Sequence, residues 1–78
     1  MKTFVVDEFT IGFDTLRSGM CQAIVTDSTN LLPIHLLFES DKINAIEKKM
    51  KTVTFKKGTT LEFFKMVVAG CIRTCMRD

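Results

Sequence analysis

The fold is decided by residues 58–77, which read GTTLEFFKMVVAGCIRTCMR. Thr59 and Glu62 have capping-box spacing, at which each side chain can bond a free backbone N–H at the start of a helix. At about 100° per residue, one continuous apolar stripe then follows the helix. Its members are Leu61, Phe64, Val68, Cys71, Ile72 and Cys75. The stripe predicts a long helix with one face packed against a sheet.

A second stripe of apolar or small residues lies beside the first and widens the apolar arc to roughly half of the helix. It consists of Phe63, Val67, Gly70 and Thr74. Small residues permit close approach of another chain, so we predict that this flank mediates self-association into a homodimer. The alternative is that the shorter helix predicted over residues 41–50 covers the flank within the fold.

Three strands are predicted before the helices, over residues 3–13, 20–26 and 31–38. Apolar and other residues alternate in each of them, the period of a strand with one buried face. Turn-forming residues at 27–30 predict a hairpin loop between the second strand and the third. Asp7-Glu8 interrupts the first strand and indicates a bulge or a bend.

Two details of these strands leave alternatives. Residues 20–26 also fit a helix capped by Asp14, although Ser18-Gly19 interrupts that pattern. Pro33 cannot donate a hydrogen bond to a neighbouring strand, which places it at a strand start or on a sheet edge.

A short helix is predicted over residues 41–50, capped by Ser40 or Asp41. Residues 53–55 are β-branched or aromatic and predict a short strand before the final helix. The predicted order is therefore β-β-β-α-β-α. We expect a single α+β domain over residues 1–78, a two-layer sandwich of a mostly antiparallel sheet with two helices on one face.

Composition limits the class of protein. The 78 residues are 46% apolar, with seven Phe and neither Trp nor Tyr. Such a small core cannot hide that much apolar surface, which favours an oligomer or a bound partner. The apolar run after Met1 is broken at Asp7, so no export signal is evident, and three cysteines suit a reducing cell better than a disulfide framework. We therefore expect a cytoplasmic protein without a membrane span.

Charge is distributed unevenly along the chain. Residues 1–41 hold two basic and six acidic side chains, whereas residues 42–78 hold nine basic and three acidic ones. Five lysines fall within ten positions: Lys48, Lys49, Lys51, Lys56 and Lys57. They predict a basic patch that binds a partner, with complementarity between the two halves, within the fold or across a dimer, as the plainer alternative.

No catalytic constellation is evident in the sequence. The single His35 could serve Cys21 as a general base, and both could join Cys71 and Cys75 around zinc, but the C-x3-C pair lies inside an apolar stripe where cysteine packs as a small hydrophobe. The glycines do not have the spacing of a phosphate loop. We expect neither an enzyme nor a cofactor.

Two functions remain. The first is a small non-enzymatic binding protein that modulates or inhibits a partner protein, acting as a homodimer. The second is a nucleic-acid-binding regulator that uses the basic segment Lys48 to Lys57. The second lacks exposed Tyr or Trp for base stacking.

Overall fold

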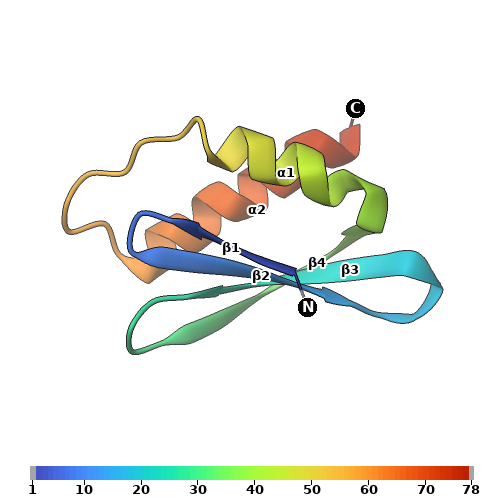
Figure 1. Ribbon diagram of the computed structural model, residues 1–78, viewed down its shortest axis with the longest axis horizontal. Helices are drawn as coiled ribbons and strands as arrows, with labels where there is room; N and C mark the ends of the chain where they lie inside the picture. Colours follow the sequence, from blue (N-terminus) through green and yellow to red (C-terminus); the bar gives the residue numbers. More distant parts are fainter. Residues whose placement is uncertain (1, 78) are drawn as a thin grey trace.

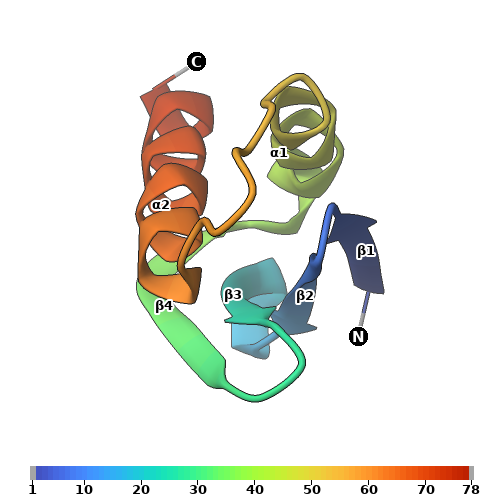
Figure 2. The same ribbon diagram turned by 90° about the vertical axis from the view of Figure 1, so that its left-hand side faces the viewer.

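The computed structural model describes residues 2–77 and has an α+β fold. Four strands form one antiparallel sheet in the order β1-β2-β3-β4. Both helices lie on the same face of that sheet (Figures 1 and 2), as predicted. The elements are β1 (Lys2–Val6), β2 (Phe9–Thr15), β3 (Met20–Thr26), β4 (Leu31–Glu39), α1 (Ile43–Met50) and α2 (Leu61–Arg77), with 3₁₀ turns η1 (Arg17–Gly19) and η2 (Ser40–Lys42).

The order of elements differs from the predicted one and is β-β-β-β-α-α. The extended stretch 3–13 is a tight hairpin, because Asp7 and Glu8 form a turn that brings Val6 opposite Phe9. Asp7 has a positive φ of 55°, a left-handed conformation that a short polar side chain tolerates better than most. The interruption therefore reverses the chain instead of bending one strand.

The predicted strand 53–55 does not exist. The backbone N–H of Val53 bonds the Met50 carbonyl at 3.2 Å, so the end of α1 turns directly into an irregular connection. Phe55 is partly buried, with its ring centroid 5.1 Å from that of Phe64 and 6.3 Å from that of Phe9. Its aromatic side chain packs against the core without any strand pairing, which explains why residue type alone misled the prediction.

The helix caps also differ from the predicted ones. The Thr60 Oγ1 accepts a hydrogen bond from the Phe63 N–H at 3.1 Å, so Thr60 caps α2 and Glu62 lies one position too early for a capping box. Helix α1 has no side-chain cap, because η2 (Ser40–Lys42) leads the chain into its first turn.

Strand β3 has the predicted bounds, and its alternating burial rules out a helix over these residues. Pro33 lies in β4, an edge strand, as its missing N–H requires. Cys21 pairs with Phe38 and Ala23 with Ile34, so β4 contains two extra residues at this point. An even number of extra residues leaves Ile34 and Phe38 on the same buried face.

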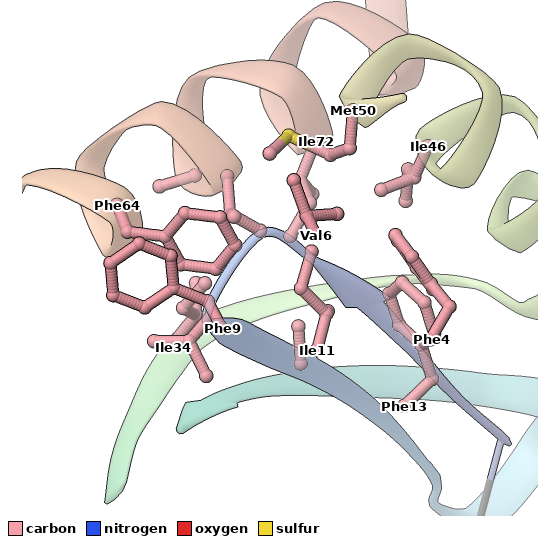
Figure 3. Packing of buried hydrophobic residues seen from close by; sticks show 14 of the residues in the cluster. Phe4, Val6, Phe9, Ile11, Phe13, Ile34, Ile46, Met50, Phe64 and Ile72 are labelled. Carbon is pink, nitrogen blue, oxygen red and sulfur yellow. The ribbon is translucent and has the colours of Figure 1, made fainter. Parts of the chain in front are cut away.

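One hydrophobic core fills the space between the sheet and the helices. Figure 3 shows sheet side chains such as Phe9 and Ile11 pointing toward Phe64 and Ile72 of α2 and Met50 of α1. The Phe9 and Phe64 rings stack with centroids 4.3 Å apart. None of the helices within residues 2–77 combines the length and the apolarity that a bilayer span requires.

Candidate functional site

The two stripes of α2 have different environments. Of the first stripe, Cys71 is half-buried and the other members are buried. In the second stripe Phe63 is 53% exposed, Val67 is half-buried, and Gly70 and Thr74 are exposed. Helix α1 therefore leaves most of the predicted self-association flank uncovered.

A hollow of about 440 Å³ lies beside this flank, between α2 and the connection that precedes it. We call it the α2 hollow. It is lined by Val53, Thr54, Phe55, Lys56, Thr59, Phe63 and Val67. In Figure 1 the connection forms the left-hand end of the molecule, and Figure 2 shows that it crosses between the two helices.

Local hydrogen bonds hold the walls of the α2 hollow in place. Thr59 donates to the Lys56 carbonyl through both its backbone N–H, at 3.1 Å, and its hydroxyl. Gly58 closes this turn at a φ of 87°, which glycine adopts without steric cost. The Thr60 cap then fixes the first turn of α2, which carries Phe63. The hollow is therefore built on ordered backbone.

The surface of the α2 hollow is apolar with a basic rim. Val53 and Phe63 expose their side chains there, while Phe55 is held against the core by the Phe9 and Phe64 rings. Lys56 is its only charged lining residue. The arrangement suits an apolar side chain with a carboxylate nearby, since nothing lining the hollow would repel a negative charge.

The five predicted lysines are all exposed, and no one hollow is lined by all of them. Lys48 and Lys51 border a hollow with Glu47, and Lys51 makes an ion pair with Glu47 at 2.8 Å. Hydrogen bonding by Lys51 lowers the pKa of the Glu47 carboxyl below its ordinary value, with a smaller contribution from Lys2. Lys49 instead lies near Cys71 of α2.

Lys56 and Lys57 lie at the far end of the connection. With Asp7 and Glu8 of the first hairpin they line a separate hollow of about 350 Å³. Acidic and basic side chains thus line the same hollow. This arrangement agrees with the alternative in which the acidic first half of the chain and its basic second half complement each other within the fold.

The cysteines and the histidine do not form a reactive group. Cys21 is buried on the inner face of the sheet, whereas His35 is exposed on β4 next to the buried Ile34 and so lies on the opposite face. Burial, together with the neighbouring Cys75, raises the pKa of the Cys71 thiol to about 11. Within residues 2–77, no cluster of three His, Cys, Asp or Glu side chains could hold a metal ion.

Sequence reasoning found the α2 side of the hollow but missed the opposite wall. Val53 and Phe55 have the residue types of a strand, and nothing in their spacing indicates that they lie beside Phe63 and Val67. The useful signal is a phenylalanine in a segment rich in lysine and threonine, because burying an aromatic ring stabilises a fold and can anchor such a segment on the core. Phe55 is that anchor.

In comparisons with known proteins, no family model, curated protein or solved structure matches this chain significantly.

Proposed function

We propose that this chain is a non-enzymatic protein-binding module that modulates or inhibits a partner protein through the α2 hollow. The carrying observation is the exposed Phe63 side chain beside a hollow whose walls are fixed by hydrogen bonds. Aromatic side chains that line ordered surface depressions are typical anchors of protein interfaces.

The partner that fits is a peptide segment or helix carrying an apolar side chain flanked by Asp or Glu. The apolar group would fill the space between Val53 and Phe63, and a carboxylate would meet Lys56 at the rim. Such charge pairs mainly raise the association rate and fix the orientation of the partner. The apolar anchor would contribute most of the affinity.

The α2 hollow supports protein binding better than nucleic-acid binding. Phosphate recognition needs several cations along one track. The basic segment is divided between Glu47 on α1 and the acidic turn at Asp7-Glu8. Nucleic-acid binding is therefore the alternative that the experiment below distinguishes from protein binding.

The test is capture by the tagged chain from its native cells, with half of each lysate treated with nuclease and bound proteins identified by mass spectrometry. Three baits are compared: the wild type, Phe63→Glu and Met66→Glu. Met66 is 69% exposed and lies on the same helix but outside the α2 hollow, so its variant carries the same charge change and serves as the matched control.

We expect one stoichiometric partner that survives nuclease, stays with Met66→Glu and is reduced at least about tenfold with Phe63→Glu, the effect of losing one anchor residue. Recovery that collapses after nuclease would make the lysines the functional surface. A partner retained equally by all three baits would place the interface elsewhere.

A further inference from the structure

The connection between α1 and α2 is attached to the core through one side chain. We call its residues 53–59 the strap. Within residues 2–77, the strap forms hydrogen bonds only to Met50 and between its own residues, so these bonds fix its shape but not its position relative to the core. Five of its seven residues are exposed and Thr59 is half-buried, whereas Phe55 packs against the hydrophobic core. The position of the strap therefore depends on one ring.

The Phe55 ring lies against a pair of stacked rings. The Phe9 and Phe64 centroids are 4.3 Å apart, and Figure 3 shows these two side chains side by side between the sheet and α2. The Phe55 centroid lies 5.1 Å from that of Phe64 and 6.3 Å from that of Phe9, in tilted and edge-on orientations. Aromatic pairs in such geometries attract each other, but contacts of this kind weaken steeply as the rings separate. A small movement of the strap would therefore release it.

The strap forms part of the wall of two hollows. Five of the seven residues that line the α2 hollow belong to the strap, and the other two, Phe63 and Val67, lie on α2. Phe55 and Lys56 also line the second hollow, of about 350 Å³, at the first hairpin. If the strap moves away from α2, the α2 hollow loses one of its two walls.

We propose that the strap is a movable wall of the α2 hollow, held closed by the Phe55 ring. It opens while the sheet and both helices stay folded, because α2 keeps its Thr60 cap and its own buried stripe when the strap leaves. Segments with few buried apolar contacts open locally at the lowest free energy in a protein. The closed strap gives the hollow both walls, and the open strap leaves only the wall on α2.

Opening of the strap regulates partner binding, a step that rests on the proposed function. An apolar anchor between Val53 and Phe63 contacts both walls, one on the strap and one on α2. Such a partner binds the closed state only, so it stabilises that state, and its apparent affinity falls in proportion to the closed fraction. Phe55 thus controls the affinity of the α2 hollow from the side of the strap that packs on the core.

Limited trypsin digestion of the purified chain tests the strap without any partner. Trypsin cuts after lysine, and cleavage within a folded protein tracks the population in which the backbone opens. Cleavage at Lys56 and Lys57 reports opening of the strap, whereas cleavage at Lys65 requires α2 to unfold. In the wild type, initial rates at the two strap sites should exceed the rate at Lys65 at least about tenfold. They should also change little with urea below the unfolding midpoint, because local opening exposes little surface.

Phe55→Ala should raise the cleavage rate at Lys56 and Lys57 at least about tenfold, the change in opening equilibrium expected for the loss of two ring contacts. Phe55→Leu keeps an apolar side chain and should give an intermediate rate, and it serves as the test if the alanine variant fails to fold, which circular dichroism checks. Val53→Ala is the matched control, because it shortens an apolar side chain of the same segment that lies outside the core cluster. It should be cut at the wild-type rate.

Equal wild-type rates at the strap sites and at Lys65, rising together with urea, would overturn the proposal, because the strap would then open only when the whole domain unfolds. An unchanged strap rate in both Phe55 variants would also overturn it, as would an equal gain in Val53→Ala, since Phe55 would not be the residue that holds the strap closed. The capture of a partner can fail without changing any of these rates, so the strap and the proposed function are tested separately.

Discussion

Phe63 and Phe64 are neighbours in the sequence and have opposite environments in the fold. Phe64 is fully buried and stacks on Phe9, whereas Phe63 is half exposed at the edge of the α2 hollow. One helix therefore carries both the main attachment to the sheet and an unused apolar surface. The comparison shows that α2 carries more apolar surface than its contacts with the sheet and α1 bury, and the proposed binding through the α2 hollow rests on this exposed part.

The largest expected effect is on the buried side of α2. Phe64→Ala should lower the free energy of unfolding by about 3–5 kcal/mol, because it removes a fully packed ring from a small core. Phe63→Ala, the matched control, should cost less than about 1 kcal/mol, as expected for an exposed side chain. Urea denaturation measures both, and equal costs would show that the two sides of α2 are equally buried.

Cys71 lies on α2 between the buried and the exposed side of the helix, so its reactivity measures how well α1 covers this part of α2. Its Sγ points to the Ile46 carbonyl at 3.8 Å. The rise of its pKa from 9.0 to about 11 should make alkylation of the folded protein at pH 8 about 100-fold slower than that of a free thiol, in proportion to the thiolate fraction.

The raised pKa of Cys71 also makes the free energy of unfolding depend on pH. The folded state favours the neutral thiol, so its contribution is complete below pH 9 and is lost as the pH rises toward 11. Mass spectrometry of iodoacetamide-treated protein, with and without urea, measures the rates. Rapid native alkylation of Cys71 would show that the contact between α1 and α2 opens freely.

Thr60 caps the start of α2, the helix that carries the exposed stripe. Thr60→Ala should cost about 1 kcal/mol of stability, because the Phe63 N–H loses its acceptor. Thr74→Ala is the control: its hydroxyl bonds the Gly70 carbonyl within the helix, and removing that bond should change stability little. Should both variants unfold at the same urea concentration as the wild type, Thr60 would not be the cap.

The smallest effect is expected at Gly70. It lies in the middle of α2, and a Cβ added there meets nothing within 4 Å. Gly70→Ala should stabilise the monomer by about 0.5–1 kcal/mol, since alanine loses less backbone entropy in a helix. Thermal unfolding at low protein concentration measures this gain. A loss of stability that appears only at high concentration would instead indicate that another chain approaches Gly70 closely.

Local patterns predicted most of the sheet and its core. The alternation in residues 20–26 and 31–38 fixed β3 and β4, and the turn between them forms through the Asp27 carboxylate, which accepts the Thr29 and Asn30 N–H groups. Those bonds lower the pKa of Asp27. Such features depend on neighbours in the chain, which is why they can be read from the sequence.

Features that depend on distant residues were not predicted. The turn at Asp7-Glu8 lacks the Gly or Asn that marks most tight hairpins, so the sequence pattern of β1 and β2 resembles that of a single strand. Residues 53–55 have strand-like side chains, but Phe55 packs on rings from β2 and α2 instead. The flank on α2 was correctly identified as a stripe, while its partner wall in the α2 hollow is visible only in three dimensions.

The order of elements, with every strand before both helices, also affects how the protein is made. The sheet is complete at Glu39, but the inner face is not fully covered until α2 has been synthesised. A chain cut short before Leu61 lacks the cover that α2 provides over Phe9 and Ile34, so such a truncated chain should bind chaperones and be cleaved by proteases far faster than the full chain.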